Sequence, residues 1–322
     1  MIHAFALTGP TASGKTSLSI EIAKELGCEI ISLDSMQIYK GMDIGTAKAS
    51  KEELSEVPHH MIDLISPDCS FSAAAYKETA LEIAADISAR GKIPFFVGGT
   101  GLYLSTLLRP ECEQPPASDP EYRRKIEENL TGEEERIRLF ERLRQIDPIS
   151  AEALHYNNVR RVIRALEIYD ATGKTKSYFD ALTKAKNSEI TVNHVTLDFH
   201  ERANLYDRVD ARVDAMIEDG LVDEVKSLIS KGYLLDDTTA AQAIGYKEIL
   251  GVVLRGDDFK ESIDSLKQAT RNYAKRQLTW FRHMENKSTV YIDQEDGTLR
   301  SKDDIYSECK SIFIKEADKI KL

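Results

Sequence analysis

An eight-residue stretch near the N-terminus, GPTASGKT, has the residue types and the spacing of a polyphosphate-binding loop, G-x-x-x-x-G-K-[ST]. Its glycines let the backbone curl so that successive N–H groups point inward at phosphate oxygens, and the following helix adds the positive end of its dipole. Lys15 would neutralise the terminal phosphate, and the Thr16 hydroxyl would bind a magnesium ion. A plain turn between a strand and a helix is the alternative. The predicted phosphate loop consists of Gly9, Pro10, Thr11, Ala12, Ser13, Gly14, Lys15 and Thr16.

A carboxylate follows a second apolar run. Asp34 comes directly after EIISL (29–33), which is typical of a buried strand. At the end of a neighbouring strand, this carboxylate could hold magnesium through water or take a proton from an incoming nucleophile. The alternative is a local turn in which the side chain accepts hydrogen bonds from its own backbone. Ser35, Gln37 and Tyr39 add polar and aromatic groups, and a glutamine can pair with an adenine edge.

A hydroxyl follows a third apolar run, IPFFVGG. Thr100 lies within GGTGLY (98–103), where small residues let a ligand or another chain approach the backbone closely. A tight turn that needs glycine is the alternative. Ligands of parallel α/β sheets bind at the carboxyl ends of the strands. We therefore expect residues 9–16, 34–39 and 98–103 to form one site.

Apolar periodicity indicates which elements position these residues. Short apolar runs that end at glycine or aspartate are typical of buried strands, and apolar residues at helical spacing predict helices. Strands that alternate with helices form a parallel, doubly wound α/β sheet. Strands are expected at 3–8, 29–33, 93–99 and 193–199, and helices at 16–26, 72–89, 201–219, 221–231, 239–254 and 259–285.

A proline- and charge-rich stretch, RPECEQPPASDPEYR, interrupts this pattern near residue 110 and marks a domain boundary. Helical patterns follow at about 133–145 and 150–172 before a strand returns. The sequence therefore predicts a P-loop NTPase-like parallel-sheet core with an inserted all-helical domain. The core is expected at residues 1–113 and 186–322, and the insertion at residues 114–185.

Composition limits the kind of protein. The chain has 322 residues and a formal net charge of −11, which argues against general adhesion to DNA or to anionic membranes. Its four cysteines are widely spaced with no C-x-x-C pair, so neither zinc ligation nor a disulfide framework is expected, and a reducing cytoplasm fits. The N-terminal apolar run is too short for a signal peptide or a membrane span. We expect a cytoplasmic monomer without membrane contact.

Two segments are nevertheless basic. Residues 155–186 hold seven Lys or Arg against three acids, and residues 267–287 hold six against one. The second segment also has Tyr273 and Trp280. Basic residues interleaved with aromatics suit RNA, whose phosphates need cations and whose unstacked bases need planar partners. A solvated helix face with Trp280 in the core is the alternative.

The phosphate loop alone does not name a reaction. Arg208 and Arg212 are four residues apart and share a helix face, where paired guanidinium groups could clamp a diphosphate or pair with carboxylates. A small-molecule or nucleotide kinase would use the same core. An RNA-binding GTPase-like module would need an Asn-Lys-x-Asp segment, which the sequence lacks.

In these and further blocks, the sequence resembles the bacterial tRNA dimethylallyltransferases, also called tRNA isopentenyltransferases. The resemblance covers nearly the whole chain, and seven ordered blocks are far more specific than any one of them. The blocks are GPTASGKT (9–16), DSMQIYKGMDIGTAK (34–48), PHHMID (58–63), GGTGLY (98–103), NNVRRVIRALE (157–167), AIGYKE (243–248) and ATRNYAKRQLTWFR (269–282).

The resemblance implies an activity and roles for the site residues. A dimethylallyl group would move from dimethylallyl diphosphate to N6 of adenosine 37 in a tRNA anticodon loop, with release of diphosphate and with Mg²⁺ as cofactor. Asp34 would take the proton from N6, Thr100 would lie near the acceptor and the leaving group, and Arg208 would bind diphosphate. The implied tRNA contacts are Asp34, Ser35, Met36, Gln37, Thr100, Arg123, Asn158, Val159, Arg160, Arg161 and Val162.

Overall fold

The computed structural model describes residues 1–110, 113, 115–184, 188–234 and 238–320. The chain divides into two compact units: a core, residues 1–108 with 190–322, and an insertion, residues 109–189. The divisions expected after 113 and after 185 differ by a few residues, because the core ends at the helix before the proline-rich stretch and resumes at the first residue of a strand. Residues 114, 185 and 186 lie outside the described residues.

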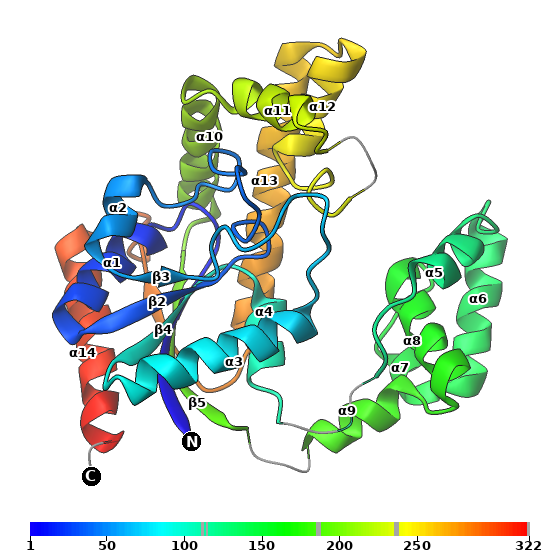
Figure 1. Cartoon of the computed structure of the whole chain (residues 1–322), viewed down its shortest axis with the longest axis horizontal. Helices are drawn as coiled ribbons and strands as arrows, with labels where there is room; N and C mark the ends of the chain where they lie inside the picture. The colour runs from blue at the N-terminus through cyan, green and yellow to red at the C-terminus, as the bar shows by residue number, and fades with distance from the viewer. Residues whose placement is uncertain (111–112, 114, 185–187, 235–237, 321–322) are drawn as a thin grey trace. The chain divides into compact units, whose positions relative to one another are not determined.

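The core is built on a parallel sheet. Within the described residues it has six strands in the order β3-β2-β4-β1-β5-β6, and every neighbouring pair is parallel (Figure 1). β1 ends at Thr8 and β2 at Leu33, and both residues lie opposite Gly98, the last residue of β4. The loops that follow these three strands therefore leave the same edge of the sheet side by side. The strands are β1 Ile2–Thr8, β2 Cys28–Leu33, β3 His59–His60, β4 Ile93–Gly98, β5 Ile190–Asp198 and β6 Lys287–Tyr291.

Helices cover both faces of this sheet. Alternation along β4 sends Phe95 to the face covered by α1 and α14, where it meets Phe313 edge-on, and Phe96 to the face covered by α3 and α4 (Figure 1). The core helices are α1 Lys15–Leu26, α2 Lys51–Glu56, α3 Ala73–Ala89, α4 Gly101–Leu107, α10 Arg202–Glu218, α11 Leu221–Ser230, α12 Tyr246–Arg255, α13 Phe259–Arg282 and α14 Lys302–Ile320. No described helix is long and apolar enough to span a bilayer.

The described part of the insertion contains only helices. Its small apolar core includes Leu143, Val162 and Leu166. The helices are α5 Pro120–Glu127, α6 Glu133–Ile146, α7 Pro148–Glu152, α8 Val159–Thr172 and α9 Lys176–Lys184.

Two predicted helices differ from the observed ones. The segment expected at 150–172 is two helices, α7 and α8, because residues 153–158 form a turn in which Asn158 Oδ1 accepts the N–H of His155 at 2.9 Å. The helix expected at 239–254 begins only at Tyr246, since Gly245 has φ 97°, outside the helical region.

Candidate active site

The phosphate loop connects β1 to α1. Gly14, with φ 88°, precedes the first turn of α1 in a left-handed conformation that favours glycine. The Lys15 ammonium donates to the carbonyls of Gly9 at 3.0 Å and Pro10 at 2.7 Å, and lies 3.4 Å from Ser13 Oγ. The amine therefore lies on the loop itself, at the wall of the cavity that the loop lines.

Two helices from the part of the core that follows the insertion, α10 and α13, bind the backbone of this loop at residues 11 and 12. Gln277 of α13 accepts the Thr11 N–H at 2.8 Å through Oε1. Arg208 of α10 donates to the Ala12 carbonyl at 2.8 Å through Nε. Arg208 is absent from the lining of the described cavities, so its observed role is to support the loop.

Asp34 lies at the end of β2 and forms the local turn that was the alternative interpretation. Its Oδ1 accepts the N–H groups of Met36 at 2.8 Å and Gln37 at 3.3 Å. The Thr100 hydroxyl accepts the N–H of Ser35, the residue after Asp34, at 3.2 Å. The turn does not exclude a chemical role, because Asp34 also lines two cavities.

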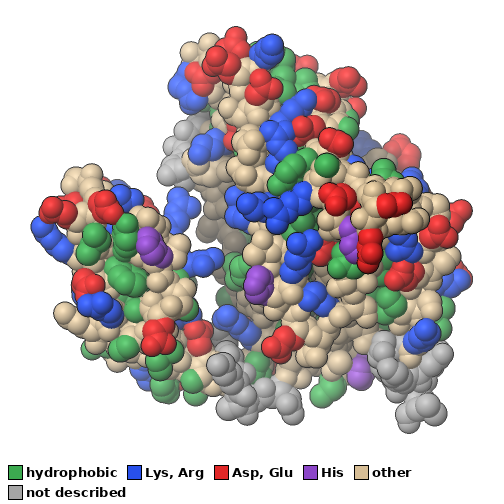
Figure 2. Space-filling model, turned by 180° about the vertical axis from the view of Figure 1, so that it is seen from behind, with side chains coloured by type: hydrophobic (Ala, Val, Ile, Leu, Met, Phe, Trp, Pro, Cys, Tyr) green, Lys and Arg blue, Asp and Glu red, His purple; other side chains and the backbone are tan. Residues whose placement is uncertain are grey.

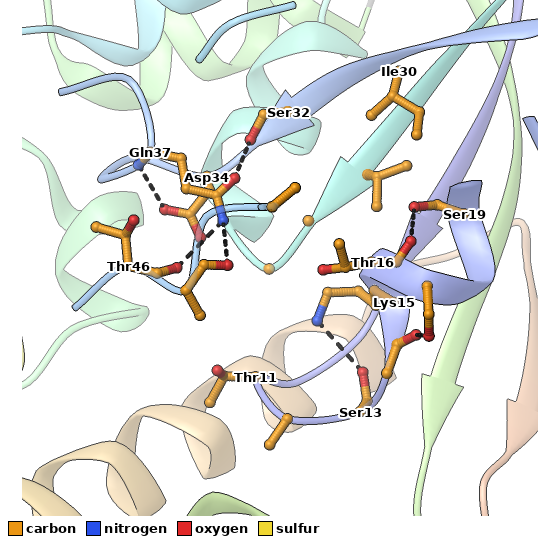
Figure 3. Close-up of a pocket in the computed structure, with 18 of the residues that line it drawn as sticks. Thr11, Ser13, Lys15, Thr16, Ser19, Ile30, Ser32, Asp34, Gln37 and Thr46 are labelled. Carbon is orange, nitrogen blue, oxygen red and sulfur yellow. Dashed lines mark hydrogen bonds between the residues drawn. The ribbon is translucent and has the colours of Figure 1, made fainter. Parts of the chain in front are cut away.

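The two cavities meet beside Asp34. One, of about 260 Å³, contains the phosphate loop, and Figure 3 shows Lys15 and Thr16 reaching into it from α1 with Asp34 on the opposite wall. The other, of about 340 Å³, has a mostly apolar lining that includes Met36 and Met216. The residues that line both cavities are Thr11, Asp34, Thr46, Arg212 and Tyr273.

Positive charge converges on the first cavity. Burial, and to a smaller extent the Arg212 charge, lower the pKa of Lys15 to about 7, although the Asp34 carboxylate acts in the opposite direction. Burial also lowers the pKa values of Arg208 and Arg212. The protein alone does not fully balance the positive charges of Lys15 and Arg212, which line this cavity. A bound anion would balance them, so the site is suited to a diphosphate.

A carboxylate on α11 fixes the loop that closes the site. Glu224 accepts the N–H groups of Asp43 at 2.9 Å, Ile44 at 2.8 Å and Gly45 at 3.1 Å. It also accepts the hydroxyl of Tyr246 at 2.6 Å. A Cβ on Gly45 would lie 2.5 Å from the Tyr246 ring, so glycine is needed for this contact. Thr46, the next residue, is thereby held at the wall that the cavities share.

Removing the Glu224 carboxylate is expected to destabilise this loop. Glu224→Ala leaves three backbone donors and a tyrosine hydroxyl without their acceptor, which should lower the free energy of unfolding by about 1–3 kcal/mol. Urea denaturation would measure this. Asp223→Ala is the control, because this neighbouring carboxylate is exposed and pairs with exposed Lys226. Equal losses of unfolding free energy in the two variants would contradict the assignment.

Gln37 and Lys48 are engaged within the protein. Gln37 Oε1 accepts the Ser32 hydroxyl at 3.0 Å, and its Nε2 donates to the carbonyls of Thr46 and Ala47. In this conformation the amide is not free to pair with an adenine edge. The Lys48 side chain is buried and pairs with Asp43 and Asp63, so its charge is compensated within the protein.

The basic segment on α13 is largely paired. Lys267 pairs with Asp214 at 2.6 Å, Arg271 with Asp210 at 2.6 Å, and Arg282 with Asp198 at 2.7 Å. Figure 2 shows Lys and Arg gathered toward the middle of the visible face of the core, with Asp and Glu mostly toward its outer parts. The sequence count therefore overstated the free positive charge of this helix.

Trp280 is 38% exposed and lies over Gly101, where a Cβ would come within 2.2 Å of its ring. Neither of the two expected settings, an open RNA-stacking face or the apolar core, describes it fully. It is a half-exposed ring that covers the start of α4.

The insertion supplies the remaining predicted tRNA contacts. Arg160 and Arg161 are exposed on the first turn of α8, Val159 is half-buried, and Asn158 precedes the helix. Val162 is 1% exposed and its side chain packs in the apolar core of the insertion, so its contact with tRNA also stays a prediction.

Arg123 is half-exposed and donates to Glu167 at 3.2 Å, so part of its charge is already compensated. Its contact with tRNA, like those of residues 158–161, stays a prediction.

Sequence reasoning missed Gln277 as a cavity residue and considered Tyr273 only as an aromatic partner for RNA bases; both lie on α13. Arg212, which was considered with Arg208 for a diphosphate clamp, lines the cavity. Helical spacing places Tyr273 and Gln277 on one face of α13, but only tertiary packing shows that this face meets the phosphate loop.

Two adjacent histidines make contacts within the protein. His60 Nε2 lies 2.9 Å from Glu29 Oε2, and His59 Nδ1 lies 2.8 Å from the Val57 carbonyl. Across the described residues no cluster of three or more His, Cys, Asp or Glu is arranged to bind a metal ion.

Comparison with known proteins identifies the family. A family model described as IPP transferase matches residues 37–284, and one described as isopentenyl transferase matches residues 2–69. The chain belongs to the IPP transferase family. A tRNA dimethylallyltransferase of Thermoanaerobacter sp. (strain X514) is 44% identical to this IPP transferase over 317 residues, which cover 98% of this chain and 97% of that protein. One of Anoxybacillus flavithermus is 46% identical over 294 residues, 91% of each chain.

Solved structures agree. The tRNA isopentenylpyrophosphate transferase of Bacillus halodurans aligns with a TM-score of 0.72 at 40% identity and covers 100% of this chain and 99% of that one. A eukaryotic dimethylallyltransferase acting on tRNA aligns with a TM-score of 0.80 at 29% identity, over 98% of this chain and 79% of that one. The predicted P-loop NTPase-like fold class is confirmed.

Proposed function

We propose that this IPP transferase moves a dimethylallyl group from dimethylallyl diphosphate to N6 of adenosine 37 in the anticodon loop of tRNA. The single observation that carries this proposal is the position of Asp34, which lines both the phosphate-loop cavity and the adjoining apolar cavity. A diphosphate held by the loop and an adenine in the neighbouring cavity would meet beside this carboxylate. The kinase alternative is not favoured, because the relatives named above are transferases that act on tRNA.

The bond changes in the proposed reaction are balanced. The N6 lone pair attacks the allylic carbon, the bond from that carbon to the diphosphate oxygen breaks, and its electron pair leaves with diphosphate. The N6 proton passes to Asp34. An exocyclic adenine amine is a poor nucleophile, since its lone pair is delocalised into the ring, so neutralisation of the leaving charge by Lys15 and Arg212 should supply the larger share of the acceleration.

The acceptor base must leave its stack to reach Asp34. Extruding a nucleotide costs a few kcal/mol, and less in a single-stranded loop than in a duplex. The anticodon loop of a tRNA is therefore a chemically reasonable source of the base. The apolar side chains of the second cavity would contact the base and the five-carbon chain: Met36, Val213, Met216, Ile244 and Leu266.

Magnesium is proposed as the cofactor. The Thr16 hydroxyl lines the phosphate-loop cavity, and Mg²⁺ is commonly held by one or two protein oxygens together with substrate phosphates and water. This hydroxyl is an oxygen ligand of the kind that the ion prefers. When bound, the ion would add neutralising charge to the leaving diphosphate.

We further propose that the protein acts as a monomer in the cytoplasm. Both cavities are lined by residues of one chain, and the acceptor, tRNA, is a cytoplasmic substrate.

The test is direct. The protein is incubated with unmodified tRNA, Mg²⁺ and dimethylallyl diphosphate, and the digested nucleosides are weighed by mass spectrometry. Adenosine that has gained one dimethylallyl group is expected from a tRNA with adenosine at position 37, and none from a tRNA with another base there. ATP consumption with a small-molecule acceptor, and no modified nucleoside, would support the kinase alternative instead.

Diphosphate binding is expected to take up a proton above neutral pH. Burial and the Arg212 charge lower the pKa of Lys15 to about 7 in the protein alone, from the ordinary lysine value of 10.5. An anion beside Lys15 favours its charged form, so the free protein binds fewer protons than the complex between about pH 7 and 10. Affinity for diphosphate should therefore fall as pH rises above about 7.

Calorimetry at about pH 8.5 in HEPES and in Tris would measure the uptake from the buffer dependence of the binding enthalpy. Lys15→Met separates the lysine from protonation of diphosphate itself. The same buffer dependence in wild type and variant would contradict the assignment.

A further inference from the structure

Gln277 is a buried amide that joins two loops of the active site. It lies within α13, and its side chain is 6% exposed. Its Oε1 accepts the Thr11 N–H at 2.8 Å, and its Nε2 donates to the Gly99 carbonyl at 3.0 Å. Both ends of the amide are satisfied, and by backbone groups more than 170 residues away in sequence.

Gly99 indicates that this contact is specific. A Cβ on Gly99 would lie 2.1 Å from Gln277 Nε2, closer than such atoms can approach. Gly99 is not among the glycines with positive φ, so the backbone conformation does not require glycine. The amide accounts for glycine here better than the tight turn or the approaching ligand considered from sequence.

The link continues toward Asp34. Gly99 precedes Thr100, whose hydroxyl accepts the Ser35 N–H at 3.2 Å, directly after Asp34. A continuous path of hydrogen bonds and peptide units therefore runs from Thr11 of the phosphate loop through Gln277 and residues 99–100 to the turn that carries the carboxylate.

We propose that Gln277 is a positioning residue for the transfer, which rests on the proposed function of this site. It sets the separation between the loop that holds the diphosphate and the turn that presents Asp34. Displacements of about 1 Å at reacting groups can cost about 10² in rate. The loop keeps its second support, Arg208 on the Ala12 carbonyl, so diphosphate binding should depend less on Gln277 than the rate does.

Gln277→Met tests this, because it keeps the side-chain length and removes both hydrogen bonds. We expect kcat to fall about 10-fold to 10²-fold, while the dissociation constants of inorganic diphosphate and of tRNA change less than about threefold. Gln294→Met, at an exposed glutamine after β6, is the matched control and should keep full activity.

Gly99→Ala should reproduce the loss, because its methyl group displaces the amide. Combined with Gln277→Met, it should add little further loss, since both changes break one contact.

The outcomes separate the two proposals. A wild-type protein that forms no modified nucleoside overturns the proposed function and this inference with it. If the wild type transfers, a Gln277→Met kcat within about twofold of the wild type overturns the positioning role alone. A loss of kcat accompanied by equal losses of diphosphate and tRNA affinity also overturns the positioning role, because that pattern indicates general unfolding.

Discussion

Asp34→Ala should retain both substrates and lose at least about 10² in turnover, the scale expected when a general base is removed. Asp34 lines both cavities and lies across the first cavity from Lys15 (Figure 3). The measurement is single-turnover transfer at saturating tRNA and dimethylallyl diphosphate, with the two affinities measured separately.

The turn at Asp34 makes a second variant informative. Oδ1 accepts the Met36 and Gln37 N–H groups, and an asparagine carbonyl can do the same. Asp34→Asn should therefore keep the turn and still lose the rate, which separates basicity from shape. Asp207→Ala on α10, at an exposed carboxylate, serves as the control. Near wild-type turnover in either Asp34 variant would reject the assignment.

Lys15→Ala should weaken diphosphate binding about 10-fold to 10²-fold and leave tRNA affinity unchanged, because a hydrogen bond to a charged group contributes about 1.5–3 kcal/mol. The Lys15 ammonium donates to carbonyls of the loop, and burial and Arg212 disfavour its positive charge. A bound anion would stabilise that charge. Titration calorimetry with inorganic diphosphate, alongside a tRNA binding assay, measures the two affinities.

Lys24→Ala is the matched control, since Lys24 lies in the last turn of the same helix and pairs with Glu56 at the surface. Its diphosphate affinity should equal that of the wild type. Equal losses of both ligands in Lys15→Ala would indicate misfolding instead of a missing phosphate contact.

The parts of the site that the sequence predicted share one property: their signal is local. The phosphate loop, Asp34 and Thr100 each follow a buried strand directly, and the parallel register places those strand ends together. Tyr273 and Gln277 carry no local signal for a place in this cavity, because the face that α13 turns to the loop depends on packing between residues far apart in sequence.

The missed elements include two edge strands and the helices α2, α4, α5, α9 and α14, the last of which has 19 residues. β3 has two residues, and β6 is a half-buried edge strand, so neither shows a clear apolar pattern. α2 has six residues but does carry a signal: Ser50 and Glu53 form a capping box, which a search for that pattern could have found.

The order in which the core is joined has a consequence for biosynthesis. The phosphate loop leaves the ribosome among the first residues, whereas its two supports, Arg208 and Gln277, follow only after the whole insertion has been made. β1 must also wait for β5, at residues 190–198, before its second edge is paired. A nascent chain that ends before α13 therefore carries the sequence of the phosphate loop but lacks Gln277, one of its two supports. The ability to bind diphosphate should arise late, once α13 has packed.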